Sequence, residues 1–317
     1  MLFPVRIKTK NCFRLLIFPI MFAASLLFPP YAGGGEQLQG TQQFKDYWYR
    51  GKAEITRYEL HQSRYGEMHK GDAVLIFVTE DFLVDKQVKH EFGDRANAVS
   101  VMKLNFTRKF NTGIYPYSVM TSVFTPVDTI KYPRTFKTTT TSQEWCGHTF
   151  GQLNLRNGKY NVEIRSYFQR ESDQDYSIRA AMLEDEIWTL IRLKPDSLPV
   201  GMIDIVPGSQ FVRFRHVPLK VEKAKASLKT VTDPSLSGNE LSVYSIEYKN
   251  IERRMVIKFE NSFPYRIVAW EETTPSGFAK NVKILTTKAV MTHSLYTDYW
   301  TKNKVKDISL REELGLR

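Results

Sequence analysis

The segment Gln143-Glu144-Trp145-Cys146-Gly147-His148 holds the most reactive combination of side chains in the sequence. If it is a β-strand, Glu144, Cys146 and His148 project from one face, with about 7 Å between successive side chains. An imidazole lowers the pKa of a neighbouring thiol and a carboxylate orients the imidazole, so these residues contain the parts of an activated nucleophile. One hypothesis is therefore a cysteine-dependent hydrolase or transferase that uses Cys146 and His148, with Glu144 as the orienting group.

A structural interpretation of the same residues is favoured. Free cysteines are among the most buried residues, and an exposed thiolate is vulnerable to oxidation outside the cytosol. Cys146 would then be a small apolar side chain beside Trp145, with His148 as a hydrogen-bonded neighbour. One cysteine and one histidine supply two ligands where zinc takes three or four, and the sequence contains no hydrolase or nucleotide-binding motif. We predict no metal and no cofactor, and we favour a protein that is not an enzyme.

Aromatic side chains are the second candidate for a site. They make up 13% of the chain, and Trp145, Tyr115, Tyr117 and Trp270 are the candidates for the lining of a groove. Aromatic faces supply contact area at a low cost in entropy, so such a groove suits an apolar or carbohydrate ligand. Packing of these rings in the core, with some tyrosines at the surface, is the interpretation that the sequence favours over a groove.

Most of the chain has the pattern of consecutive β-strands. β-branched and aromatic residues recur in runs of about four to ten that end at turn residues, and Met255, Ile257 and Phe259 would share one face of a strand. Asn-Thr-Gly at 111–113 and Arg-Asn-Gly at 156–158 predict tight hairpins, because Asn and Gly tolerate a positive φ. The predicted strands are residues 53–62, 72–79, 99–110, 114–124, 136–150, 160–168, 202–206, 210–215, 219–230, 241–248, 253–259, 265–272 and 282–291.

Residues 182–193 break the period of two. Ile187, Leu190 and Ile191 have the spacing of one helix face, acidic residues precede them and basic residues follow, so we predict a helix, with a strand as the alternative. Residues 306–316 show a weaker pattern of the same kind. Because long strands joined by short turns form antiparallel sheets, we predict a mainly β fold with one or two short helices. Its large curved antiparallel sheet is a barrel, a half-barrel or a sandwich.

Residues 1–32 have the layout of a secretory signal peptide. Four basic residues precede an apolar run of 14 residues, and Ala32 is a small residue at the cut. The run is shorter than the roughly 20 residues that span a bilayer as a helix, so we predict cleavage and no stable transmembrane span. The expected organisation is a signal peptide at 1–32, a flexible lead at 33–43 and a single β-rich domain at 44–317, in a periplasmic or secreted protein.

The charge of the chain limits its partners. The 317 residues include 45 Lys+Arg and 34 Asp+Glu, a net charge of +11, and removal of residues 1–32 takes away four cations and no acid, which lowers it to +7. The remaining excess is spread without a basic run, so we predict no nucleic-acid partner. Weak attraction to anionic membrane surfaces or to anionic polysaccharides stays open. Cys146 is the only cysteine after residue 32, so the chain left by the predicted cleavage can form no internal disulfide.

Several segments together resemble a family of exported proteins from Bacteroidetes-type bacteria. The segments are KDYWYRGKAEITRYEL (45–60), RYGE (64–67), AVLIFVTEDF (73–82), KFNTGIYPYS (109–118), QEWCGH (143–148), YFQRESD (167–173) and WEET (270–273). The resemblance covers most of residues 45–310 and implies export, but it brings no catalytic assignment. Members of this family are sometimes labelled septum formation inhibitor Maf. That label is misleading, because true Maf nucleotide pyrophosphatases are cytoplasmic α/β proteins with an early Ser-x-Ser-Pro-Arg-Arg motif, which this sequence lacks.

The concave face of a curved sheet must be filled by side chains, by the helix near residue 187 or by a ligand. The sequence therefore predicts an exported β-protein that binds an apolar or envelope-derived ligand, or an envelope protein partner, on this face. The cysteine-dependent enzyme is the alternative.

Overall fold

The computed structural model describes residues 40–234, 236, 240–278 and 281–316. The predicted signal peptide at 1–32 and residues 33–39 of the predicted lead lie outside the described residues. The folded chain begins within the rest of that lead. Helix α1, Gln42–Trp48, starts after Thr41, whose Oγ1 accepts a hydrogen bond from the Phe44 backbone N–H at 3.1 Å.

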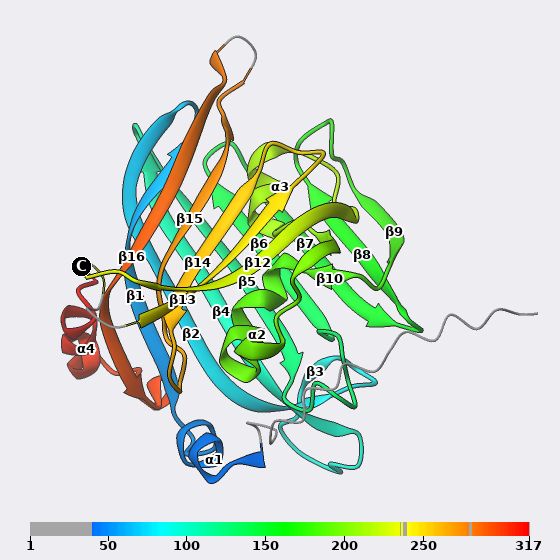
Figure 1. Ribbon diagram of the computed structural model, residues 1–317, viewed down its shortest axis with the longest axis vertical. Helices are drawn as coiled ribbons and strands as arrows, with labels where there is room; N and C mark the ends of the chain where they lie inside the picture. The colour runs from blue at the N-terminus through cyan, green and yellow to red at the C-terminus, as the bar shows by residue number, and fades with distance from the viewer. Residues whose placement is uncertain (1–39, 235, 237–239, 279–280, 317) are drawn as a thin grey trace, which may run out of the picture. The chain divides into compact units, whose positions relative to one another are not determined.

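The strands of the described residues form one open sheet (Figure 1). They are β1 Ala53–Arg64, β2 Glu67–Leu83, β3 Val88–Lys89, β4 Ala98–Thr112, β5 Tyr115–Pro126, β6 Lys137–Glu144, β7 Gly147–Arg156, β8 Lys159–Ser166, β9 Gln174–Arg179, β10 Met182–Leu183, β11 Gly201–Val206, β12 Glu222–Thr232, β13 Glu240–Tyr248, β14 Arg254–Glu260, β15 Ile267–Ser276 and β16 Lys283–Thr297. Their order is β10-β11-β12-β13-β14-β15-β16-β1-β2-β4-β5-β6-β7-β8-β9, with β3 against β2. All pairs are antiparallel except β10 with β11.

The two ends of this sheet show that it is open. The sheet is not closed between its end strands β9 and β10, so the predicted mainly β fold with one large antiparallel sheet is confirmed. Only Ala180 and Ala181 separate β9 from β10 in the sequence. Because two residues span only a few ångströms, the end strands lie near each other and the sheet must curl strongly.

Two hairpin turns lie where Asn and Gly residues predicted them, and a third turn divides a segment that was predicted as one strand. Asn157 and Gly158 adopt φ values of 49° and 73° between β7 and β8, and the turn between β4 and β5 includes Gly113 with φ 58°. The prediction of one strand over 136–150 is wrong, because a two-residue turn, Trp145-Cys146, divides it into β6 and β7. Threonines continue the β pattern up to this turn, so the sequence gives no break before it.

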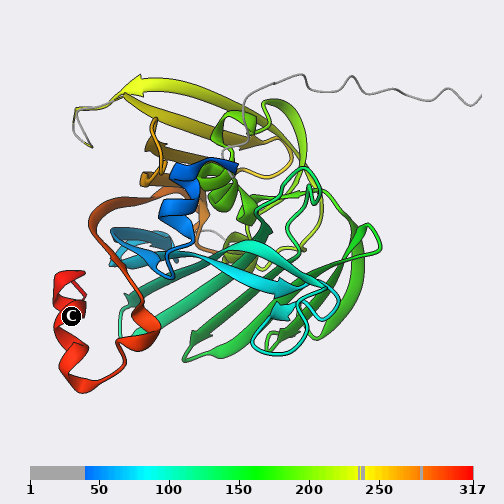
Figure 2. The same ribbon diagram turned by 90° about the horizontal axis from the view of Figure 1, so that it is seen from below.

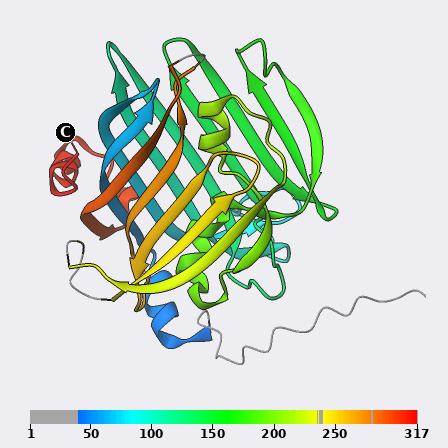
Figure 3. The same cartoon turned by 45° about the horizontal axis from the view of Figure 1, so that its top comes forward.

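Helix α2, Glu184–Leu193, lies on the concave side of the sheet (Figures 2 and 3). It confirms the helix predicted near residue 187. The ring centroid of Trp188 lies 5.0 Å from that of Phe106 and 5.3 Å from that of Trp270, both in edge-to-face geometry. The helix therefore fills much of the space that the curved sheet encloses.

Buried ion pairs fix both ends of α2. At its start, the Glu184 carboxylate accepts hydrogen bonds from Arg253, which precedes β14. At its end, Arg192 donates to both oxygens of Glu54 on β1, at 2.7 and 2.6 Å. All four side chains are almost completely buried. Both pairs join α2 to the part of the sheet that contains β1 and β14, away from β6–β9.

The prediction of a strand over 210–215 is wrong, because this segment is helix α3, Ser209–Arg215. Short aromatic runs favour strands, but here the Ser209 backbone N–H donates to the carboxylate of Asp185 at 3.1 Å, and His216 ends the helix with φ 52°. Phe211 and Phe214 are buried between this helix and the sheet. α3 also lies on the concave side (Figure 3).

The remaining helical segments are short. They are α4, Ser309–Glu313, within the predicted terminal helix, and single 3-10 turns at Pro195–Ser197, Tyr299–Thr301 and Val305–Ile308. Leu314, just after α4, packs on the outer face of the sheet. Among the described residues, none of the helices combines the length and the apolar character needed to cross a membrane.

Candidate functional site

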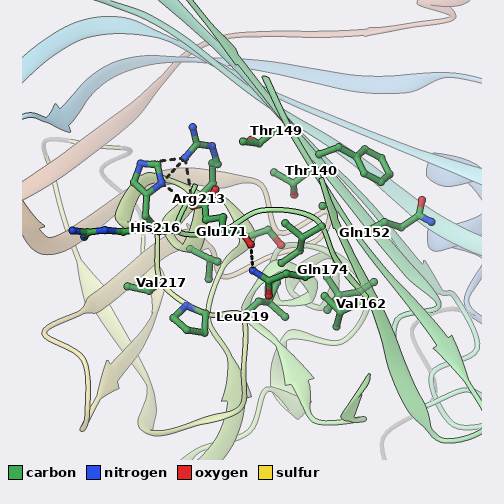
Figure 4. Close-up of a pocket in the computed structure, with 18 residues that line it drawn as sticks. Thr140, Thr149, Gln152, Val162, Glu171, Gln174, Arg213, His216, Val217 and Leu219 are labelled. Carbon is green, nitrogen blue, oxygen red and sulfur yellow. Dashed lines mark hydrogen bonds and ion pairs between the residues drawn. The ribbon is translucent and has the colours of Figure 1, made fainter. Parts of the chain in front are cut away.

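A cavity of about 120 Å³ lies between the inner face of β6–β8 and the segment that α3 and residues 216–219 form (Figure 4). Much of its wall is apolar and belongs to a second hydrophobic cluster, beside the main core around α2. The shared residues are Leu153, Val162, Val212 and Leu219, with Ile164 and Val217 packed against them. An apolar cavity of about 150 Å³ holds one benzene-sized guest, so this space suits a small apolar group.

One end of the cavity is polar and is formed by Arg213, Glu171 and His216 (Figure 4). His216 Nδ1 lies 2.7 Å from Glu171 Oε1, which requires a proton on Nδ1. Arg213 Nη1 lies 3.1 Å from Nδ1 and 3.2 Å from Nε2 of the same ring, and with Nδ1 protonated only Nε2 is left to accept from it. Burial alone would raise the pKa of Glu171, but hydrogen bonds from His216 and Ser166 and the charge of Arg213 lower it. Glu171 is therefore held as a carboxylate.

Of the three residues at the polar end of the cavity, Arg213 uses the smallest part of its hydrogen-bonding capacity. Its side chain is only 8% exposed, and burial lowers the pKa of its guanidinium. Its nearest carboxylate oxygens are 3.8 Å away on Glu171 and 4.0 Å away on Glu144, both beyond hydrogen-bond distance. Among the described residues its Nε finds no hydrogen-bond partner. The buried Arg192 and Arg253, by contrast, each donate directly to a carboxylate.

The elements that position these groups are held by local interactions. The left-handed backbone of His216 turns the chain at the end of α3, and Glu171 lies in the turn between β8 and β9, where Ser172 is also left-handed. Asp185 on α2 accepts from the first N–H and the hydroxyl of α3. Burial raises the pKa of Asp185 to about 6, so the anchor of α3 titrates in the mildly acidic range.

Gly151 on β7 leaves the cavity open. It lines the cavity and pairs in the sheet with the inward-facing Thr140. A Cβ at this position would have no atom within 4 Å, whereas a Cβ at Gly71, another strand glycine, would meet the Lys109 backbone oxygen at 2.2 Å. The absence of a side chain at residue 151 therefore contributes directly to the space.

The predicted catalytic residues lie at the β6–β7 turn but do not form the expected triad. Glu144 is buried on the inner face, while His148, one position past the register partner Gly147, is exposed on the outer face. Cys146 is exposed in the turn itself, so the favoured prediction of a buried structural cysteine is also wrong. Its backbone N–H donates to Glu144 Oε2 at 2.7 Å. The hydrogen bond with Glu144 is the main cause that raises the pKa of the Cys146 thiol, which is opposite to activation.

The predicted aromatic residues divide into two groups. Tyr115, Tyr117 and Trp145 lie together near the turns of β4–β5 and β6–β7, with ring centroids 5.8 Å apart for the two tyrosines and 6.4 Å apart for Tyr115 and Trp145. Trp270 is fully buried in the main core, where it packs against Tyr58 at 4.7 Å. None of the four lines the cavity beneath α3.

The sequence reasoning missed Arg213, His216, Glu171 and Gly151. Glu171, in the β8–β9 turn, lies more than 40 residues before Arg213 and His216, and 210–215 was predicted as a strand, so no spacing rule joins the three. A glycine inside the β pattern at 151 was the one available signal, since it can mark a close approach or a gap. Within the described ranges, no three His, Cys, Asp or Glu side chains are placed to hold a metal ion.

Comparisons of the chain with protein-family models, with curated proteins and with solved structures found no match.

Proposed function

We propose that the protein binds a small amphipathic anion, with the apolar part of the ligand in the cavity beneath α3 and its carboxylate at Arg213. The observation that carries this proposal is a buried guanidinium with an unpaired Nε at one end of a space whose wall is largely apolar. Burying a charge without a close partner is unfavourable, and a ligand carboxylate would supply charge-assisted hydrogen bonds.

The two neighbouring carboxylates are already bonded to other donors, which supports an anionic ligand as the partner of Arg213. Glu171 is already bonded to His216 and Ser166, so its carboxylate is committed to these two donors. Glu144 is bonded to the turn at Cys146. Arg213 can therefore turn toward a ligand without breaking a short ion pair. The cavity volume limits the buried apolar part to a short alkyl or single-ring group.

The test is calorimetric titration with three probes of equal chain length, namely octanoate, octanol and octylamine. We expect octanoate to bind most tightly and octylamine most weakly. Arg213→Gln should weaken octanoate binding by at least about tenfold, since a hydrogen bond to a charged group contributes about 1.5–3 kcal/mol, and should leave octanol binding nearly unchanged.

Gly151→Leu provides a second test that does not disturb the charged groups. The added side chain would enter the cavity, where a Cβ has no neighbour within 4 Å, so octanoate and octanol should both lose binding. Thr141→Leu adds a similar side chain at an exposed position of the adjacent strand β6 and should bind like the parent. No binding of octanoate by the parent, or full binding by Gly151→Leu, would contradict the proposal.

We also propose that the protein is exported and that it belongs to the family of exported proteins that its sequence resembles. They rest on the basic and apolar pattern of residues 1–32, which predicts delivery to the periplasm or the medium. An envelope-derived carboxylate would be available to the protein there. Recovery of the chain only from the cytosol, with residues 1–32 intact, would contradict this part.

A further inference from the structure

Apolar side chains gather at the tips of five hairpins at one end of the sheet. The turns of β1–β2, β4–β5, β6–β7, β8–β9 and β15–β16 all lie toward the top of the molecule in Figures 1 and 3. The side chains that we call the aromatic rim come from these turns and are Tyr65, Tyr115, Trp145, Tyr167, Phe168 and Phe278. The tips thus place large rings from distant parts of the sequence at one surface.

Ring contacts connect the rim into one continuous surface. Tyr115 contacts Trp145 on one side and donates a hydrogen bond to the Tyr65 hydroxyl at 3.2 Å on the other. The Tyr65 and Phe278 centroids are 6.0 Å apart. His216 then joins the two remaining parts, at 6.1 Å from Phe278 and 5.0 Å from Phe168.

Two further contacts almost complete a closed ring of contacts around the rim. The Phe168 ring lies 5.8 Å from that of Tyr167, and a Cβ at Gly147 would meet the Tyr167 ring at 2.8 Å, next to the turn that holds Trp145. Trp145 is 69% exposed and Tyr167 is 77% exposed. Ile114 and Met68, at two of the same hairpins, are exposed as well. Soluble surfaces rarely leave so many neighbouring large side chains in water, which marks an interaction surface.

We infer that the aromatic rim docks the protein on an anionic lipid surface. Indole and phenol rings combine an apolar body with a polar end, which suits the boundary between lipid headgroups and acyl chains. The side chains protrude from separate hairpin tips, so they can enter that boundary without a groove on the partner. The net charge of +11, or +7 without residues 1–32, attracts anionic headgroups.

Two tryptophans give a matched test. Trp145 lies in the rim, whereas Trp300, 46% exposed, lies in the 3-10 turn that follows β16. Affinity is measured by cosedimentation with vesicles of phosphatidylcholine mixed with phosphatidylglycerol. We expect Trp145→Ala to bind at least about tenfold more weakly than the parent, since burying a large ring stabilises by more than about 1.4 kcal/mol, and Trp300→Ala to bind like the parent.

A second measurement uses fluorescence. In Trp300→Phe, Trp145 is the only tryptophan among the described residues with substantial exposure, so bromine-labelled lipids in the vesicles should quench its emission. Equal binding of Trp145→Ala and Trp300→Ala, no vesicle binding by the parent, or unquenched emission would overturn the inference. Equal affinity for pure phosphatidylcholine would overturn the choice of an anionic surface.

The vesicle measurement also separates docking from ligand binding in the cavity. Gly151→Leu fills the cavity beneath α3 but leaves the rim unchanged, so it should bind vesicles like the parent. Loss of vesicle binding in this variant would show that single lipids are captured by the cavity, and it would overturn docking through the rim. Loss of octanoate binding with intact vesicle binding is the result that both proposals predict for Gly151→Leu.

Discussion

The ion pair between Arg192 and Glu54 should be essential for the stability of the fold. Arg192 makes two hydrogen bonds to Glu54, at 2.7 and 2.6 Å, and a third to the Pro264 carbonyl at 2.8 Å. Arg192→Met would leave the Glu54 carboxylate buried with Tyr47 as its one remaining side-chain donor among the described residues. Breaking a buried pair in this way lowers the free energy of unfolding by about 3–5 kcal/mol.

The pH dependence of this loss has a defined sign. Burial alone would raise the pKa of Glu54, but the charge and hydrogen bonds of Arg192 lower it below 4.5, so the pair contributes stability at neutral pH that is lost as the pH falls through that pKa. Without Arg192, burial raises the pKa of Glu54 and protonation relieves its cost. The decrease in the free energy of unfolding that Arg192→Met causes should therefore be largest at neutral pH and smaller near about pH 5.

Urea denaturation at the two pH values measures this effect, with Glu54→Leu/Arg192→Met as the control. The double variant removes both charges, so we expect it to be more stable than Arg192→Met at neutral pH by at least about 2 kcal/mol. A deficit below about 1 kcal/mol for Arg192→Met, or a double variant no more stable than the single one, would refute the reasoning.

Two further predictions concern titratable groups near the cavity and the β6–β7 turn. Because burial raises the pKa of Asp185 from 3.8 to about 6, its ionisation destabilises the folded state as the pH rises through this range. The stability of Asp185→Asn relative to the parent, from urea denaturation, should therefore increase between about pH 4 and pH 6, and a constant difference would contradict this. In a Cys12→Ser chain, alkylation of Cys146 should be slow near neutral pH, and Glu144→Gln should accelerate it, because Glu144 raises the thiol pKa. Fast alkylation of Cys146 in the presence of Glu144 would instead favour the cysteine-dependent enzyme.

Local patterns were sufficient for most of the fold. Alternating residues predicted most of the long strands, Asn157-Gly158 predicted its hairpin, and the spacing around Ile187 predicted α2. The errors arose where neighbours outside the segment decide the structure. Residues 210–215 became a helix because Asp185 accepts hydrogen bonds from the N–H and the hydroxyl of the preceding Ser209, and because the segment is buried on several sides. The strands at the two ends of the sheet, β9 and β10, are short and lack a strong alternating pattern.

The site was less predictable because it depends on how the sheet curls. The sequence drew attention to Glu144, Cys146 and His148, which are near each other along the chain, but Cys146 lies in a turn, and Glu144 and His148 face opposite sides of the sheet. Arg213 and Glu171 meet only because the β8–β9 turn lies against the end of α3. A lone arginine in a predicted strand carries no signal for a cavity. Its unpaired Nε becomes visible only when burial and distances are known.

The most direct measurement for the proposed binding function is a crystal structure of the protein with bromine-labelled octanoate. We predict that the anomalous signal of bromine lies in the cavity between β7, β8 and α3, and that the carboxylate lies within hydrogen-bond distance of Arg213. Bromine located elsewhere, with the cavity filled by the protein's own side chains, would contradict the proposal.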